Sequence, residues 1–306
     1  MARPDSSGRA GNGQARPEQA GAPDLAGADA PVIETREISK FFTAGRDALG
    51  RSRPPVKAVD GVSLAIRRGE TLALVGETGS GKTTFGRLLL GLYRPTSGDI
   101  RYRGTSILDR KSPAARDVRR QVQGVFQDPY SSLNPTRTLE YILVRPLRNY
   151  GKLSKRQARD KAAELLETVA LTPPGRYLGR YAYELSGGQR QRVVIARALA
   201  PEPELIVADE PISSLDVSIR AEILELLNKL VKEHDVGILY ITHDLLSARM
   251  LSDEMPVLNE GALIERGPSV SVIQHPSHPC TRELLDAVPN PFDLEQRRGG
   301  RPIVSA

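Results

Sequence analysis

The sequence has few of the features that mark secreted, disulfide-bonded or membrane-spanning proteins. Its 306 residues include one cysteine, Cys280, which excludes an internal disulfide and a multi-cysteine zinc or iron–sulfur site within one copy. A low cysteine content is typical of proteins in a reducing compartment. No apolar run approaches the roughly 18 residues of a spanning helix, and the N-terminus lacks an apolar h-region. We therefore expect neither a membrane span nor a signal peptide, and membrane association would need a partner.

Large apolar side chains are also nearly absent from residues 1–30, which are rich in Gly, Ala, Pro and Asp. Such a segment cannot bury enough surface to offset the entropy of ordering, so we predict a disordered tail there. The whole chain is 39% hydrophobic and 26% charged, as in soluble proteins that bury a core. Its net charge of +6 lies partly in Arg-containing tails, and it indicates a mildly basic surface more than a nucleic-acid groove.

The chain after residue 30 alternates between strand-like and helix-like segments. Residues 31–42 and 56–66 have the pattern of a small sheet. Residues 205–208 and 237–242 resemble short strands buried in a parallel sheet, and residues 217–231 between them carry apolar side chains on one helical stripe. This order is a βαβ unit, so we predict an α/β fold with an added antiparallel sheet.

A helical insertion is predicted over about residues 128–185. Ser154 and Gln157 form a capping-box pattern before an amphipathic stretch. Leu205 begins the next strand-like segment after a second helix that starts near Ser186.

A glycine-rich segment after the strand-like residues 71–75 fits the pattern G-x-x-x-x-G-K-[ST] and precedes a helix-like stretch. Its glycines let backbone N–H groups turn inward around phosphate oxygens, and the helix N-terminus adds its positive dipole end. We expect Lys82 to reach the terminal phosphates of a nucleotide and the Thr83 hydroxyl to bind Mg²⁺. The predicted nucleotide-binding residues of this loop are Gly76, Glu77, Thr78, Gly79, Ser80, Gly81, Lys82, Thr83 and Thr84.

Two carboxylates follow the apolar strand 205–208. Asp209 and Glu210 should lie at the carboxyl edge of the parallel sheet, where ligands of α/β folds bind. Asp209 suits Mg²⁺ coordination, and Glu210 suits orienting and deprotonating an attacking water. The alternative for such a pair is capping of the next helix, which the preceding phosphate loop makes the weaker interpretation.

Two further polar residues end strand-like segments. His243 follows residues 237–242 and could hydrogen-bond a γ-phosphate and sense its loss. Gln127 follows residues 122–126, and its amide could touch Mg²⁺ or water.

A second glycine-bearing turn, Ser186, Gly187, Gly188 and Gln189, stands at another helix N-terminus and is a second candidate anion site. We find no internal repeat, so one chain has one nucleotide-binding unit. An interpretation that uses both turns is a dimer, in which this turn completes the phosphate site of a facing chain.

These residues together resemble the ATP-binding subunits of ABC transporters, from about residue 32 to 291. The resemblance implies that residues 76–83 are the Walker A loop, Gln127 the Q-loop, residues 186–189 the signature, and residues 205–209 the Walker B strand. It makes Glu210 the catalytic base, residues 214–216 the D-loop and His243 the switch histidine. The family also places an aromatic side chain on adenine, for which Phe42 is the best match and Phe41 the alternative.

The segments 127–135 and 275–285 resemble the oligopeptide/dipeptide importers, a subfamily that includes nickel importers. The resemblance implies a phosphate-loop, RecA-like domain over residues 31–270 and a C-terminal extension over residues 271–306, partly disordered. It also implies a magnesium-dependent ATPase at the cytoplasmic face of the membrane. Its expected partners are membrane permeases, a second ATP-binding subunit in a head-to-tail dimer and, indirectly, a substrate-binding protein.

The sequence is less compatible with two other classes of function. One is a soluble ABC-type ATPase acting on nucleic acid or ribosomes, whose usual second cassette, zinc cysteines or coiled-coil insertion this chain lacks. The other is a regulatory protein with a vestigial site. The presence of Lys82, Asp209, Glu210 and His243 argues against it, because a vestigial site would not need them.

Overall fold

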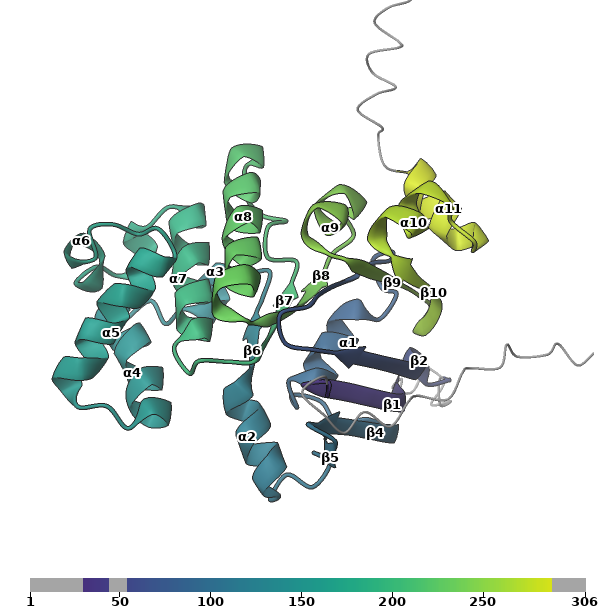
Figure 1. The fold of residues 1–306 in the computed structure, drawn as a ribbon, viewed down its shortest axis with the longest axis horizontal. Coiled ribbons are helices and arrows are strands. Elements are labelled where there is room, and N and C mark those ends of the chain that lie inside the picture. Colours follow the sequence, from purple (N-terminus) through teal and green to yellow (C-terminus); the bar gives the residue numbers. More distant parts are fainter. Residues whose placement is uncertain (1–29, 44–53, 288–306) are drawn as a thin grey trace, which may run out of the picture. The chain divides into compact units, whose positions relative to one another are not determined.

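Two sheets form the framework of the chain in the computed structural model, which describes residues 30–43 and 54–287 (Figure 1). The larger sheet contains β3 (Thr71–Leu74), β6 (Val122–Val125), β7 (Leu205–Asp209), β8 (Gly237–Ile241), β9 (Glu254–Asn259) and β10 (Ala262–Pro268). The smaller contains β1 (Ile33–Phe42), β2 (Val56–Ile66), β4 (Ser97–Tyr102) and β5 (Thr105–Ser106). The predicted disordered tail and the end of the C-terminal extension lie outside the described residues.

The larger sheet has the order β10-β9-β3-β8-β7-β6, and β3, β8, β7 and β6 run parallel. The smaller sheet is antiparallel, in the order β2-β1-β4-β5. The predicted α/β fold with an antiparallel subdomain is therefore confirmed. A hairpin of β9 and β10, which the sequence patterns had not revealed, extends the parallel sheet at one edge.

The central strands β3, β7 and β8 of the larger sheet are buried on both faces, which explains why they are apolar at successive positions. In β7, Ile206 and Ala208 point into one hydrophobic core. Leu205 and Val207, the alternate residues, point into the other. A strand between two cores has no face for polar side chains, so these can appear only at the strand ends.

The strand ends are aligned. Leu74 of β3 is paired with Ile241 of β8, which is paired in turn with Asp209 of β7. The phosphate loop, the Asp209–Glu210 pair and His243 therefore leave the sheet at the same edge, as is usual for ligand sites of open α/β sheets.

Helices cover both faces of the larger sheet (Figure 1). The main ones are α1 (Lys82–Leu89), α2 (Pro113–Gln121), α7 (Gly187–Leu199), α8 (Val217–His234) and α9 (Leu245–Leu251). Helix α1 shares a core with the smaller sheet through Phe85, Leu88 and Leu89. The buried residues of α7, α8 and α9 belong to the other core.

Helix α8 carries the predicted apolar stripe, with one difference. Ile223, Leu226, Leu227 and Leu230 are buried, but Ile219 is only partly buried. A Cβ on Gly188 of α7 would lie 2.6 Å from Ile219 Cγ2, so the two helices are in close contact there.

The predicted helical insertion contains α3 (Pro129–Ser132), α4 (Leu139–Gly151), α5 (Lys155–Thr168), α6 (Gly175–Leu178) and the 3₁₀ turn η1 (Ala182–Glu184). Ser154 caps α5 in a capping box with Gln157, as predicted. These elements pack against α7 and share its hydrophobic core.

The described part of the C-terminal extension consists of α10 (Ser269–Gln274) and α11 (Pro279–Asp286). Glu265 of β10 ties it to the sheet by accepting hydrogen bonds from the backbone N–H groups of Ser277 and His278, at 2.8 and 3.1 Å. Partial burial alone would raise the pKa of Glu265, but the hydrogen bonds that it accepts from this segment lower it.

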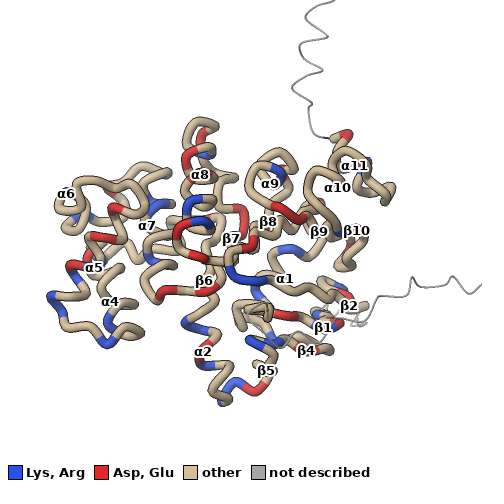
Figure 2. Tube along the Cα trace, viewed as in Figure 1, with Lys and Arg blue, Asp and Glu red and all other residues tan. Residues whose placement is uncertain are grey.

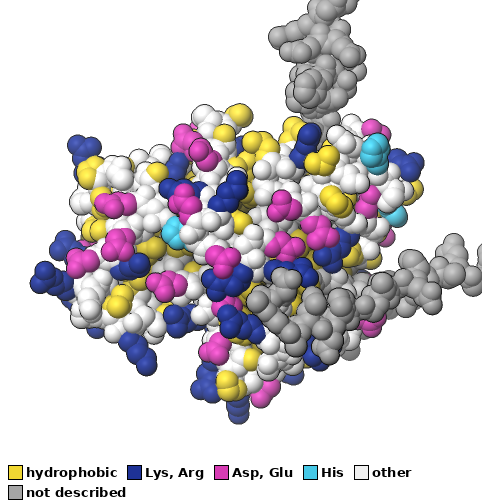
Figure 3. All heavy atoms as spheres, in the orientation of Figure 1, with side chains coloured by type: hydrophobic (Ala, Val, Ile, Leu, Met, Phe, Trp, Pro, Cys, Tyr) yellow, Lys and Arg dark blue, Asp and Glu magenta, His cyan; other side chains and the backbone are white. Residues whose placement is uncertain are grey.

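Charges of both signs are interspersed over most elements of the described chain (Figure 2). The face drawn in Figure 3 shows the same mixture and no broad basic stripe. None of the helices in residues 30–43 and 54–287 has the length and apolar character needed to cross a membrane.

Candidate active site

The phosphate loop lies between β3 and α1 and is pressed against two other strands. A Cβ on Gly76 (φ 148°) would lie 2.1 Å from the carbonyl oxygen of Leu258 in β9. A Cβ on Gly81 (φ 106°) would lie 2.0 Å from the carbonyl oxygen of Ala58 in β2. Only glycine fits at both positions, for its positive φ and for this close backbone approach.

The remaining loop residues divide by exposure. Glu77, Thr78 and Gly79 form an exposed tip, while Ser80 is buried and Thr83 and Thr84 are partly buried.

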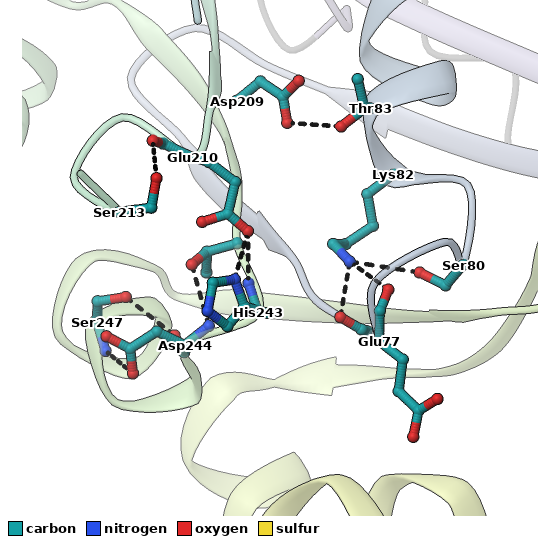
Figure 4. Close-up of polar contacts among 12 residues, drawn as sticks. Glu77, Ser80, Lys82, Thr83, Asp209, Glu210, Ser213, His243, Asp244 and Ser247 are labelled. Carbon is teal, nitrogen blue, oxygen red and sulfur yellow. Dashed lines mark hydrogen bonds and ion pairs between the residues drawn. The ribbon is translucent and has the colours of Figure 1, made fainter. Parts of the chain in front are cut away.

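Lys82 is a buried cation with neutral hydrogen-bond partners. Its side-chain ammonium donates to the carbonyl oxygens of Gly76 and Glu77, at 2.7 Å each, and to Ser80 Oγ at 3.4 Å (Figure 4). No carboxylate lies within ion-pair distance of it in the described chain. Burial lowers the pKa of Lys82, and the nearby charges of Glu210, Asp209 and Glu77 oppose that shift. A desolvated cation without a counter-ion fits an anionic phosphate.

Asp209 and Glu210 are adjacent but point to different partners (Figure 4). Asp209 Oδ1 accepts a hydrogen bond from Thr83 Oγ1 at 3.1 Å. Glu210 has φ 50°, a left-handed conformation that is costly for a non-glycine residue and is found at functional sites. The reversal directs Glu210 away from Thr83, so the two carboxylates can have separate roles.

Glu210 is held by His243. Its Oε1 lies 2.7 Å from His243 Nδ1 and accepts the backbone N–H of His243 at 3.1 Å. Oε2 has no hydrogen bond to the described residues. The predicted base and the predicted phosphate sensor thus contact each other directly, which their separation in sequence did not indicate.

The buried carboxyl of Asp209 suits a metal ion. Burial raises the pKa of Asp209, which the Thr83 hydrogen bond opposes and the charge of Glu210 reinforces. Neighbouring Thr83 adds a second oxygen of the hard type that Mg²⁺ prefers. Residues 30–43 and 54–287 contain no cluster of three or more His, Cys, Asp or Glu side chains that could hold a metal by itself. The donors present fit an ion shared with nucleotide phosphates.

Three predicted parts lie outside this hydrogen-bonded group. The first is Gln127, whose exposed amide bonds to none of the described residues, while its carbonyl lies 3.5 Å from Ser214 Oγ. The second is Phe42, which is 36% exposed and meets Tyr93 edge-to-face at 5.5 Å. Tyr93 lies far from Phe42 in sequence, and no pattern pointed to it.

The third part is the second glycine turn. Ser186 caps α7, where its Oγ accepts the N–H of Gln189 at 3.3 Å and Gln189 Oε1 accepts the N–H of Ser186 at 3.1 Å. This reciprocal box leaves the N–H groups of Gly187 and Gly188 as the free donors of the first turn. None of the four residues hydrogen-bonds to the phosphate loop or to Asp209, Glu210 or His243 in the described chain.

Comparisons with known proteins agree with this geometry. A family model described as "ABC transporter" matches residues 59–213. The chain belongs to the ABC transporter family. Its phosphate loop and its Asp209–Glu210 pair both fall within the matched region, and the resemblance predicted from the sequence is confirmed.

Two curated relatives span most of this ABC ATPase. The oligopeptide transport ATP-binding protein AppF of Bacillus subtilis is 43% identical over 259 residues, which are 84% of this chain and 78% of AppF. The dipeptide transport ATP-binding protein DppF of Escherichia coli is 41% identical over 270 residues, 87% of this chain and 80% of DppF.

A solved ABC cassette has the same fold. The dimeric structure of a post-hydrolysis state of the ATP-binding cassette MJ0796, bound to ADP and Pi, matches with a TM-score of 0.68 and 30% identity. The match covers 78% of this chain and 98% of that one. This chain is therefore an ATP-binding subunit with the fold and the activity of an ABC ATPase.

Replacing Lys82 with Ala should weaken ATP binding. The change removes the buried cation that fits the phosphates, and losing one hydrogen bond to a charged group corresponds to roughly 10- to 100-fold in affinity. Titration with a fluorescent ATP analogue measures the effect. Lys155→Ala, at an exposed position of α5, is the control and should bind normally. Equal affinity in the two variants would contradict the assignment of Lys82.

Proposed function

We propose that this chain is the ATPase subunit that energises import of oligopeptides or dipeptides through membrane permease subunits. The proposal is supported by the extent of the match to AppF and DppF, which carry peptide transport in their names. The chain would act at the cytoplasmic face of the membrane as a peripheral subunit. A substrate-binding protein would deliver the peptide to the permeases.

The divergence of Asp209 and Glu210 is the observation that carries the hydrolysis mechanism. Glu210 uses Oε1 to accept two hydrogen bonds from His243, so Oε2 is the oxygen that can orient and deprotonate a water. His243 holds this carboxylate in one orientation and would also respond to the γ-phosphate. Asp209 faces the opposite way, toward Thr83.

Thr83 and Asp209 would hold Mg²⁺, with Gln127 joining when its exposed amide turns inward. The ion would neutralise charge that develops on the phosphate oxygens. Lys82 contributes a fixed positive charge at the same phosphates, in a buried position where electrostatic interactions are stronger than in water. Phe42, with its partly exposed ring, is proposed to stack on adenine.

The complete site would need a second ATP-binding subunit, either the same chain or a related one. Ser186, Gly187, Gly188 and Gln189 hydrogen-bond to nothing else in the site of their own chain, yet Gly187 and Gly188 present free N–H groups at a helix N-terminus. In a head-to-tail dimer these groups would meet the γ-phosphate held by the facing chain. The match to a dimeric cassette supports this arrangement.

The alternative of a soluble ATPase that acts on nucleic acid gains no support from these comparisons. Charges of both signs are mixed on the face drawn in Figure 3, and this face has no basic stripe of the kind that binds a phosphate backbone.

Glu210→Gln should abolish most hydrolysis and spare ATP binding, because glutamine keeps the shape of the side chain but cannot accept a proton. A lost general base lowers turnover by about 10²–10⁴-fold. Phosphate release gives the turnover and nucleotide titration gives the affinity. Glu225→Gln, on the exposed side of α8, should be unaffected. Near-normal turnover in Glu210→Gln would exclude this carboxylate as the base.

Mixing Ser186→Arg chains with Lys82→Ala chains tests the shared site. In a head-to-tail pair, one site combines both defects and the other is intact, so the mixture should regain part of the ATPase activity that each variant lacks alone. Lys82→Ala mixed with itself is the control and should stay inactive. Absence of any recovery would count against a site composed of two chains.

Purification from membranes tests the transport function. We expect permease subunits to accompany the chain, and we expect di- and oligopeptides, supplied with the binding protein, to stimulate ATP hydrolysis by the assembly. An equimolar mixture of free amino acids is the control. Stimulation by nucleic acid, or by amino acids as strongly as by peptides, would contradict peptide import.

A further inference from the structure

Arg190, in the first turn of α7, is buried without a carboxylate partner in the described chain. Its side chain is 6% exposed. Nε and Nη2 both donate to the carbonyl oxygen of Leu185, at 3.2 and 2.6 Å. Nη1 is buried and has no hydrogen-bond partner. Burying an incompletely paired cation is unfavourable, so a residue in this position calls for an explanation beyond packing.

Tyr130 covers this guanidinium. The central carbon of the Arg190 guanidinium lies 3.5 Å from the centre of the Tyr130 ring. The tyrosine is 64% exposed, so its ring lies between the guanidinium and solvent. Stacking on an aromatic face stabilises an arginine that lacks a full set of hydrogen bonds. Arg190 is therefore held between the Leu185 carbonyl and the ring of Tyr130.

The contact with Leu185 positions the second glycine turn, residues 186–189, which is called the signature turn below. Leu185 directly precedes Ser186, the N-cap of α7. Fixing its carbonyl fixes the path by which the chain enters the helix. That path sets the direction of the N–H groups of Gly187 and Gly188, which are the free donors of the turn.

Tyr130 is in turn linked to the catalytic edge of the sheet. Asp128, next to Gln127, caps α3 by accepting the N–H of Tyr130 at 2.8 Å. The Gln127 carbonyl contacts Ser214 Oγ at 3.5 Å. The neighbouring Ser213 donates its Oγ–H to the carbonyl of Glu210 at 3.1 Å. A continuous series of contacts thus joins Glu210 to the signature turn of the same chain.

We propose that Arg190 and Tyr130 are a positioning pair, which aims the signature turn and ties its orientation to the segment at Gln127. Arg190 acts through the Leu185 carbonyl and Tyr130 through Arg190, so both are positioning residues. The inference rests on the proposed two-chain site, because the aim of the turn matters for catalysis only when the turn faces another chain's phosphates.

Amide hydrogen exchange of the full chain tests the pair directly. Tyr130→Ala should raise exchange in the peptide that covers residues 185–190 by about tenfold, the factor that a desolvated stacked cation can supply. Tyr130→Phe keeps the ring and should behave as the native chain. Tyr141→Ala is the matched control, since Tyr141 of α4 is 40% exposed and its ring centre lies 4.6 Å from the central carbon of the Arg137 guanidinium. It should leave the peptide unchanged.

Steady-state hydrolysis by the membrane assembly separates positioning from stability. Tyr130→Ala and Arg190→Lys should each lower kcat about tenfold, because lysine lacks the planar fork and the stacking face, and the KM for ATP should stay constant. The double variant should be no slower than Arg190→Lys alone. Thermal melting verifies that the variants fold. If Arg190→Lys is unfolded, the variants of the exposed Tyr130 still test whether the contact positions the signature turn.

Two results would overturn the proposal. One is native exchange in the signature peptide of Tyr130→Ala, or equal effects of Ala and Phe at this position. The other is raised exchange with an unchanged kcat, since the contact would then serve only the fold. Failure of the two-chain site would appear separately, in the mixed Ser186→Arg and Lys82→Ala experiment, which alters neither Arg190 nor Tyr130.

Discussion

The burial of both faces of the central strands of the six-stranded sheet is the constraint on which the site depends. Strands β3, β7 and β8 lie between two hydrophobic cores, so their side chains are predominantly apolar along their length. The register aligns their last residues, Leu74, Asp209 and Ile241. Polar chemistry is thereby confined to one edge, where the phosphate loop, two carboxylates and a histidine converge from distant parts of the sequence.

Burial also prepares this edge for a charged ligand. It lowers the pKa of Lys82 and raises that of Asp209, since each is removed from water and neither is ion-paired with the other. Both charged forms would gain from an anionic phosphate and a cation placed between them. The charges of Lys82 and Asp209 are incompletely paired within the described part of the protein. A magnesium nucleotide suits such a site, because it brings an anionic phosphate for the lysine and a cation for the aspartate.

The signature turn is proposed to supply further hydrogen-bond donors to the phosphates of a facing chain. Its capping box uses the polar side chains of Ser186 and Gln189 within the chain, so the donors left over belong to the backbone. Backbone donors have no side-chain torsions of their own and can be aimed only through the path of the chain. The contacts of Leu185, Arg190 and Tyr130 control that path, which connects the two halves of the proposed site within one subunit.

Local patterns were enough to identify the parts, because each rests on chemistry between near neighbours: the glycines before Lys82, the apolar strand before Asp209, and Ser154 with Gln157 at a helix start. The pairing of β9 with β3, the close approach of Ala58 and Leu258 to the loop, and the stacking of Tyr130 on Arg190 could not be read from such patterns. Each depends on a contact between segments far apart in the chain, which only the packed fold creates. The sequence by itself determined where the phosphate loop is expected, at residues 76–84. The tertiary structure decided that Glu210 turns away from Asp209 toward His243, because the left-handed turn at Glu210 is held by the neighbouring strand β8.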